Sequence, residues 1–396
     1  MVDTSAITLS ENRAVERARI RKERVRSSLI DLIVTLGTIM IALLIGFIVT
    51  LAVGKEPIKA YTALLTGPLS QVNRLGNWIQ DATTLILIGL SVSIAFQARQ
   101  FNLGAEGSLL VGALTAAVVA LYVPLPPVLG IVVPLLAAMT AGFLVALIPG
   151  WMKAYLNANE VVSTLMINAI IANLYQYLLI NFLTPEGDNV RRSALLPATS
   201  AFPLLADIFN ANLGRANLAI VLVLIAVIAV WVLMRRTSFG YEVRMIGANE
   251  KFARYGGINT RRVIMLSFAI GGAVAAIGGV HLALGVHNRL ILGISAGLGF
   301  EGIVVAMLAR NNPLLVPITG LFYSYLRIGG DIMERTASVG AEIVQVIQAV
   351  IILLITAQFV IEFVRARRNT SGTSSSRTAA ASDATAVPSE QSRRNI

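Results

Sequence analysis

The residues best suited to chemistry in this chain are two glutamates in matching short motifs. Glu106 lies in Gly-Ala-Glu-Gly at 104–107, and Glu301 lies in Gly-Phe-Glu-Gly at 299–302. Acids within apolar runs are costly in a membrane and usually face a water-filled cavity or a partner. One interpretation is that both carboxylates line or gate a solute path, holding broken helices through bonds to backbone amides. The other is that each caps a helix N-terminus, where the helix dipole favours negative charge.

Other reactive side chains are scarce. The chain has no cysteine, and its two histidines are His281 and His287. This excludes disulfides and cysteine nucleophiles and leaves little for imidazole chemistry, so we expect no catalytic residue, no metal and no cofactor. Gly297, Gly299 and Gly302 spell a dinucleotide fingerprint, but that motif requires a preceding strand that the sequence does not offer. The phosphate loop ending in Gly-Lys-Ser/Thr is also absent, so the chain cannot hydrolyse ATP by that route.

The composition shows which solvent surrounds these residues. Of 396 residues, 56% are hydrophobic and 13% are charged, whereas soluble domains carry roughly 25% charged residues. The mean hydropathy is +0.75. These values indicate a protein in a lipid bilayer. The net charge of +11 fits membrane orientation better than nucleic-acid binding, because the basic residues gather at the ends of apolar segments.

Long apolar runs predict an all-α, polytopic membrane protein with about ten transmembrane helices. A helix needs about 20 apolar residues to cross the roughly 30 Å hydrocarbon layer. The candidate spans are Leu29–Val53, Thr83–Ala98, Ala105–Tyr122, Val128–Ile148, Val161–Phe182, Asn217–Met234, Val263–Leu284, Gly293–Ala309, Leu314–Gly330 and Glu342–Phe363. The second and eighth are short. Two long outer segments, 54–82 and 183–216, are expected to hold short amphipathic pieces at the outer surface.

Basic residues predict the orientation, because Lys and Arg concentrate on the cytoplasmic side of a membrane. Residues 1–28 form a basic arm before an uncleaved first span. With this arm inside, the inner segments hold 20 Lys and Arg against nine outside, Arg327 being counted with the outer set. We therefore place both termini in the cytoplasm. The transmembrane domain spans 29–365 with a cytoplasmic loop at 235–262, and the polar tail at 366–396 is expected to be disordered.

The two motifs also suggest an internal repeat. Glu160 and Glu342 each open a further apolar run, 54 residues after Glu106 and 41 residues after Glu301. On this topology the matched elements start on opposite sides of the membrane, as in an inverted repeat of five plus five spans. Such repeats are common in transporters, where broken helices mark the substrate path. Similarity this brief also arises by chance, so both explanations stay open.

The cytoplasmic loop contains a predicted short helix of about seven residues. Asn249 is a favourable N-cap, Glu250 falls in the first turn, and Gly256 with Gly257 can end the helix. One interpretation is a solvated connector held at the lipid headgroups by arginines. The other is a docking helix whose Phe252 and Tyr255 insert into a soluble partner.

Four stretches carry a resemblance to a known family. They are FNLGAEGSLLVGALTAA from Phe101, ANEVVSTLMINAI from Ala158, GANEKFARYGGINTRRV from Gly247 and GISAGLGFEGIVVAMLARNNPL from Gly293. Together they resemble permease subunits of bacterial ABC importers in the branched-chain amino acid and ribose permease superfamily, closest to the nucleoside type. The resemblance covers roughly 30–365 and leaves out the arm and the tail.

The resemblance implies partners, a location and site residues. A separate ATP-binding subunit, a second permease subunit, identical or different, and an extracellular substrate-binding lipoprotein are expected, all at the bacterial plasma membrane. The substrate pathway would include Phe101, Asn102, Glu106, Asn168, Phe300 and Glu301. The helix that couples to the ATPase would comprise Ala248, Asn249, Glu250, Phe252, Ala253, Arg254, Tyr255, Gly256 and Gly257.

A nucleoside has an aromatic base to stack and a ribose to hydrogen-bond, so an apolar path with a few polar groups suits it. Asn173 and Tyr175 are further candidate contacts. For every asparagine here the alternative is a bond between helices, and for every aromatic residue it is packing or an interfacial belt.

We therefore predict a non-enzymatic permease that takes up nucleosides by alternating access, driven by ATP hydrolysis in a partner. A sugar such as ribose is the alternative substrate. An ion-coupled secondary transporter is an alternative from another class, and a membrane-embedded enzyme is the least supported.

Overall fold

The computed structural model describes residues 56–187, 190–209 and 214–337, with isolated positions between 44 and 51 and between 340 and 350. Nearly all of them belong to one compact unit, Thr50–Gln348. The described part is helical and has no strand beyond two isolated bridges, which confirms the all-α prediction. The basic arm, the tail and most of the first and tenth predicted spans lie outside the described residues.

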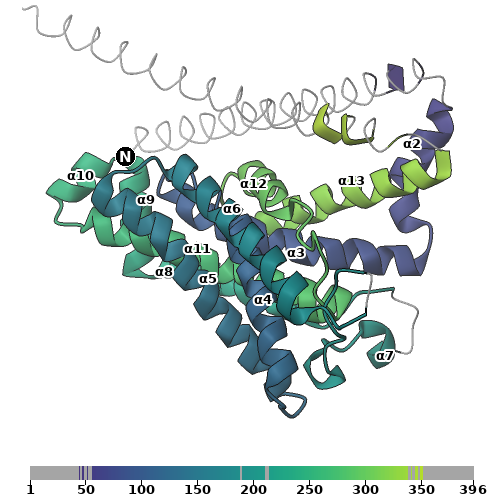
Figure 1. Cartoon of the computed structure of the whole chain (residues 1–396). Helices are drawn as coiled ribbons and strands as arrows, with labels where there is room; N and C mark the ends of the chain where they lie inside the picture. Colours follow the sequence, from purple (N-terminus) through teal and green to yellow (C-terminus); the bar gives the residue numbers. More distant parts are fainter. Residues whose placement is uncertain are drawn as a thin grey trace, which may run out of the picture. The chain divides into compact units, whose positions relative to one another are not determined.

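The helices follow one another along this unit (Figure 1). They are α2 (Pro57–Thr66), α3 (Val72–Gln97), α4 (Ala105–Tyr122), α5 (Leu129–Leu156), α6 (Glu160–Leu178), α7 (Leu205–Phe209), α8 (Ala219–Arg236), α9 (Ser238–Ala248), α10 (Glu250–Tyr255), α11 (Thr260–Val280), α12 (Leu298–Leu308) and α13 (Val316–Ala337). Two of them continue as π-helical turns: α6 through Leu179–Leu183 and α11 through His281–His287. The longest connection between these helices leads from the extension of α6 at Leu183 to α7 at Leu205.

Six helices in the described residues are long and apolar enough to cross a membrane. They are α3, α4, α5, α8, and α6 and α11 with their π-helical extensions. The predicted span Ala105–Tyr122 matches α4 at both ends. The described residues thus confirm a polytopic chain. They establish neither the count of ten spans nor the inverted repeat.

The predicted second span is wrong at its start and in its shortness, because α3 begins at Val72 and has 26 residues. Its first three turns carry polar residues that hide the helix in a hydropathy pattern. These residues find partners on neighbouring segments: Trp78 Nε1 donates to the Leu321 carbonyl at 2.8 Å, and Arg74 Nη1 donates to Ser70 Oγ at 2.9 Å. Tertiary contacts therefore extend the helix beyond its apolar part.

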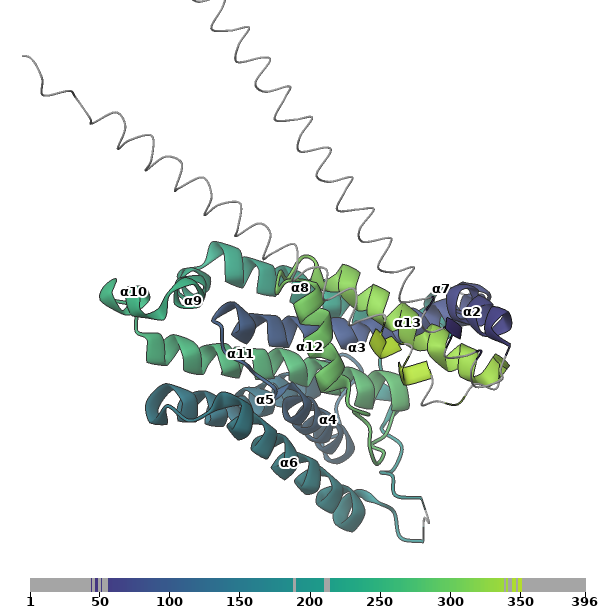
Figure 2. The same ribbon diagram turned by 90° about the horizontal axis from the view of Figure 1, so that it is seen from above.

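The bundle is organised around α11, which packs against α3, α4 and α5 (Figure 2). Small residues allow this close packing. A Cβ on Gly142 of α5 would lie 2.5 Å from the Gly272 carbonyl of α11, so neither position accepts a larger side chain without moving a backbone. Between membrane helices, small residues of this kind let the backbones approach each other.

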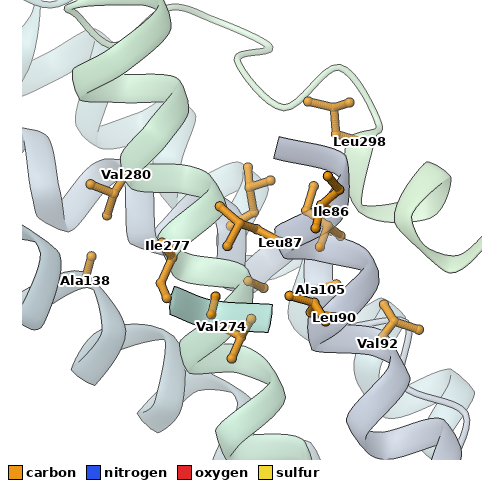
Figure 3. Close-up of a cluster of buried hydrophobic side chains, with 14 of the residues drawn as sticks. Ile86, Leu87, Leu90, Val92, Ala105, Ala138, Val274, Ile277, Val280 and Leu298 are labelled. Carbon is orange, nitrogen blue, oxygen red and sulfur yellow. The ribbon is translucent and has the colours of Figure 1, made fainter. Parts of the chain in front are cut away.

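The core lies where α3 and α11 cross α4 and the start of α12 (Figure 3). Leu87 and Leu90 of α3 are fully buried, and Val274 and Ile277 of α11 pack beside them. By contrast, α5, α6 and α8 leave most of their apolar side chains partly or fully exposed. Exposed apolar faces on helices of this length are suited to lipid or to another membrane subunit.

The surface elements gather at opposite ends of the bundle. Helices α9 and α10 lie at one end, and α2 and α7 lie at the other (Figures 1 and 2). Helix α2 is fixed to α13, where the Tyr325 hydroxyl donates to the Leu65 carbonyl and the Tyr325 ring packs edge-on against Trp78 at 5.3 Å. The segments 54–82 and 183–216 thus do contain short helices, as expected, although α3 already begins in the first of them.

Candidate functional site

The start of α4 is reached by a segment that turns back into the bundle. After α3 ends at Gln97, Arg99 adopts a left-handed conformation with φ 56°, and the chain runs extended to Gly104. On α11, Gly272 lies against Ser108, close to the midpoint of that helix with its extension, Thr260–His287. Helix α4 therefore begins about halfway along its neighbour.

The start of α12 is reached in the same manner from the other end of the bundle. Asn288 is left-handed with φ 52°, and Leu290 exchanges backbone and side-chain bonds with Ser193, with Ser193 N donating to the Leu290 carbonyl at 2.9 Å. Helix α12 then begins beside the middle of α3, where a Cβ on Gly302 would meet Ile88 at 2.3 Å.

The two Gly-x-Glu-Gly motifs meet at these helix starts. Glu106, in the first turn of α4, accepts a hydrogen bond at Oε2 from the Gly299 amide in the first turn of α12, at 2.6 Å. The first amides of a helix have no partner within the helix and carry the positive end of its dipole, so a carboxylate is well placed here. Glu106 of the first motif thus accepts from a backbone amide at the start of α12, and this amide belongs to Gly299 of the second motif.

Asn102 and Asn168 are both buried at this meeting point, and their amides are used by the backbone. Asn102 Oδ1 accepts from the Gly104 amide at 2.8 Å. Asn168 Oδ1 accepts from the Gly107 amide at 2.9 Å, and its Nδ2 donates to the Leu103 carbonyl at 2.7 Å. Asn168 thus connects α6 to the segment before α4 and to the first turn of α4. A bond of this kind between helices was the alternative to a substrate contact.

Phe101 and Phe300 remain accessible beside these buried turns. Their exposed fractions are 49% and 46%, and the Phe101 ring lies 4.9 Å from that of Phe96. Each therefore offers aromatic surface next to a re-entrant segment. Tyr175, another candidate contact, is buried, and its hydroxyl donates to the Ile291 carbonyl at 2.8 Å, which holds α6 against the segment leading to α12.

Glu301 is paired with an arginine that the sequence analysis assigned to an outer segment. Arg327 lies within α13, and its Nη1 is 3.2 Å from Glu301 Oε2 and 3.4 Å from Asp81 Oδ1 of α3. The sequence analysis counted Arg327 with the outer set, although it falls within the predicted span Leu314–Gly330, and did not predict this pairing. A single arginine among the apolar residues of 314–330 is the signal that could have identified it, since such charges are usually paired.

The predicted surface helix is confirmed as α10, Glu250–Tyr255. Asn249 caps it by accepting from the Phe252 amide at 3.1 Å, and the helix ends at Gly256 before Gly257, which has φ 84°. Phe252 is 62% exposed and Tyr255 is 92% exposed. Two accessible aromatic side chains thus stand on a short capped helix at one end of the bundle.

The other members of this segment fix α10 or border it. Ala253 is buried, Arg254 pairs with Glu250 at 3.4 Å across one turn, and Ala248 ends α9. Helix α9 in turn contacts the end of α3, because a Cβ on Gly247 would lie 2.0 Å from the Gln97 carbonyl. The surface helix is therefore connected through α9 to a long helix of the bundle.

The described residues contain no group of three or more metal-ligating side chains. Buried His281 has neighbours at both ring nitrogens: Thr84 Oγ1 lies 2.9 Å from Nδ1, and Asn217 Nδ2 lies 3.2 Å from Nε2. This histidine connects α11 to α3 and to the segment before α8.

The arrangement of re-entrant helix starts and an exposed aromatic surface helix agrees with the comparison against known families. The family described as "Branched-chain amino acid transport system / permease component" matches residues 74–356, which include both motifs and α10. The chain belongs to this permease family. It is a multi-pass membrane protein and an ABC transporter permease of the nucleoside and sugar type.

Three relatives show the range of solutes named within the family. The permease is 34% identical to a glucose ABC transporter permease protein of Haloferax volcanii, over 81% of this chain and 86% of the relative. It is 32% identical to a guanosine ABC transporter permease protein of Bacillus subtilis, over 86% and 97%. It is 29% identical to a nucleoside ABC transporter permease protein of Lactococcus lactis, over 83% and 92%. No solved structure matches the chain.

Proposed function

We propose that this permease takes up nucleosides through a path bordered by the first turns of α4 and α12, by alternating access driven by ATP hydrolysis in a partner subunit. The observation that carries the proposal is the contact between the two turns, Glu106 to Gly299 at 2.6 Å, with Phe101 and Phe300 exposed beside it. Helix starts that meet inside a bundle are a common substrate location in transporters. Exposed aromatic rings suit the stacking of a nucleobase.

A simple sugar is the second candidate substrate. The relative named for glucose has an identity similar to that of the relative named for guanosine, and aromatic faces also pack against sugar rings. Family membership favours an ABC permease over the ion-coupled carrier and the membrane-embedded enzyme. The choice between a nucleoside and a sugar is therefore tested by measuring uptake directly.

The substrate test uses vesicles that contain the permease with its ATP-binding subunit and binding protein. Uptake of labelled guanosine is measured in competition with other nucleosides, ribose and glucose. We expect unlabelled nucleosides to reduce uptake at concentrations at least tenfold below those of either sugar. Competition by ribose or glucose at equal or lower concentrations would make the sugar proposal correct instead.

We propose further that α10 is the contact for the ATP-binding subunit, which places the loop 235–262 and both chain termini on the cytoplasmic side of the bacterial plasma membrane. In this arrangement 29–365 is the permease domain, between the arm at 1–28 and the tail at 366–396. A second permease subunit and an extracellular binding lipoprotein complete the importer. The support is the exposure of Phe252 and Tyr255 on a helix that Asn249 caps at its N-terminus.

This contact is tested by the double substitution Phe252→Asp with Tyr255→Asp. We expect co-purification of the ATP-binding subunit to fall at least tenfold, because two charges would replace apolar anchors. Tyr122→Asp is the matched control, since Tyr122 is 66% exposed at the far end of α4 and should leave the complex intact. Normal complex formation by the double variant would exclude α10 as the contact.

A further inference from the structure

Three charged side chains from three helices form a largely enclosed ion-pair triad. Arg327 of α13 places Nη1 3.4 Å from Asp81 Oδ1 on α3 and 3.2 Å from Glu301 Oε2 on α12. The exposed side-chain fractions are 24% for Arg327, 16% for Asp81 and 26% for Glu301. One nitrogen thus serves two carboxylates, and the triad joins the start of α12 to two long helices.

The two carboxylates are held differently. Asp81 is bound twice by α13, since Ser324 Oγ donates to its Oδ2 at 2.8 Å, one turn before Arg327. The Trp78 side chain, one turn earlier on α3, also donates to α13, at the Leu321 carbonyl. Glu301 joins the triad through Arg327. The bond between Asp81 and Arg327 therefore lies within a firm contact of two long helices, whereas Glu301 arrives on a separate short helix.

Helix α12 has the features of an element that can tilt. Its 11 residues span about 16 Å, roughly half of the hydrocarbon layer. Gly293 and Gly297 have φ of 72° and 81°, and a Cβ on either would meet no atom within 4 Å. The segment leading into α12 is thus held by backbone conformation rather than by packing at these two positions.

Two contacts on one face of α12 are too close to be released easily and define a pivot line, because Gly302 is packed as tightly as Gly299: a Cβ on Gly302 would lie 2.3 Å from Ile88 of α3. A Cβ on Gly299 would lie 2.6 Å from Glu106 Cα, so the first turn of α12 lies directly on α4. A tilt about this line would move the side chains of Glu301 and the exposed Phe300, which project from other faces of the helix, while Gly299 stays bonded to Glu106. Arg327 would retain Asp81 throughout, which matters because an unpaired charge within a membrane is costly.

We propose that Arg327 is a positioning residue for transport: it holds Glu301 in one state of the cycle and releases it in the other, so that α12 tilts and Phe300 changes its exposure. This inference rests on the proposed ATP-driven importer. Asp81 is the permanent partner of Arg327, and Glu301 is the exchangeable one. The triad thereby lets a charged contact open between α12 and α13 without leaving the arginine unpaired.

The test uses the absence of cysteine from the chain. A single Phe300→Cys reporter is placed in the otherwise unchanged permease, assembled with its ATP-binding subunit and binding protein in vesicles. Labelling by a maleimide is measured without nucleotide and in the vanadate-trapped state. We expect the two labelling rates to differ at least threefold when the triad is intact.

Substitutions in the triad should then act in opposite directions. Arg327→Met and Glu301→Gln, each in the reporter background, should label in both states at the rate of the released state. Asp81→Asn should label in both states at the rate of the held state, because Arg327 would be left with Glu301 as its carboxylate. Glu301→Gln removes the exchangeable contact and keeps Arg327 paired with Asp81, so it tests the proposal even where Arg327→Met fails to assemble.

Arg335→Met is the matched control, since Arg335 lies on an exposed stretch of the same helix, and it should keep the threefold difference. Two results would overturn the positioning role alone. One is a difference in labelling rate between the two states that persists in Glu301→Gln. The other is that Asp81→Asn and Glu301→Gln label at the same rates. Labelling of the Phe300→Cys reporter at one rate in both states would overturn this inference, and absence of ATP-driven uptake by the permease that retains Phe300 would overturn the proposed function as well.

Discussion

The first turns of α4 and α12 share the motif Gly-x-Glu-Gly, but their surroundings differ in kind. The turn of α4 is held by neutral side-chain amides, Asn102 on Gly104 and Asn168 on Gly107. The turn of α12 is held by charged groups, Glu106 on the Gly299 amide and Arg327 on Glu301. The same motif thus starts two helices, while the neighbouring helices decide what each glutamate does.

The difference indicates which of the two turns is fixed. Asn168 bonds on both sides of the turn before α4, and each neutral bond contributes about 1 kcal/mol without depending on a distant charge. The charged contacts of α12 depend strongly on the presence of their partners, because an isolated charge is poorly solvated in the bundle. We therefore regard the start of α4 as a fixed support on which Gly299 rests, and Glu301 as the part of α12 that its partner Arg327 can reposition.

The largest expected effect comes from Gly299, the first glycine of the second motif. Gly299→Ala places a Cβ 2.6 Å from backbone atoms of Glu106, which cannot move without shifting α4. We expect the variant to lose about 3 kcal/mol of stability, the upper end of usual overpacking costs, and to lose uptake. The measurement is the thermal unfolding midpoint of the purified complex, with uptake in vesicles.

Gly104→Ala is the matched control for that substitution. Its Cβ would meet the Asn102 Oδ1 atom at 3.0 Å and Thr164 at 3.5 Å, both on side chains, and the cost should be about 1 kcal/mol or less. Equal losses in the two variants would show that the two turns are equally tightly packed and would remove the contrast between them.

An intermediate effect is expected at Asn168. Asn168→Ala leaves the Gly107 amide and the Leu103 carbonyl without their partner, and we expect a loss of about 2 kcal/mol in the thermal unfolding measurement. Asn173→Ala, on the same helix, removes an exposed side chain that bonds to its own helix at Ala169 and should change little. An Asn168→Ala variant as stable as Asn173→Ala would show that α4 does not need this support.

The smallest effect is expected for Glu106→Gln. The amide oxygen can still accept from Gly299, so the variant loses mainly the attraction between the charge and the helix dipole, about 0.3–1 kcal/mol. Uptake should stay within threefold of the parent rate. A loss of uptake above tenfold with normal unfolding would show that the negative charge itself is needed in the path, for example to contact solute.

Sequence patterns predicted most helix positions but only part of the candidate site. Ala105–Tyr122 and the cap at Asn249 were predictable because a continuous apolar run and a local side-chain bond depend on neighbouring residues alone. The first turns of α3 were missed because their polar residues are satisfied by α13 and by the segment before α3. The partner of Glu301 was missed because Asp81 and Arg327 are separated from it by 220 and 26 residues along the chain.

The sequence by itself determined that the chain is a helical membrane protein, that Glu106 lies in the first turn of a helix, and that α10 is a short capped surface helix. These features follow from local hydrophobicity, capping and turn chemistry. Only the tertiary structure decided that Glu106 binds the amide of Gly299 and that Glu301 binds Arg327. The reason is physical: a carboxylate can accept from any donor, and only the packing of α3, α4, α12 and α13 determines which donor lies within 3.5 Å.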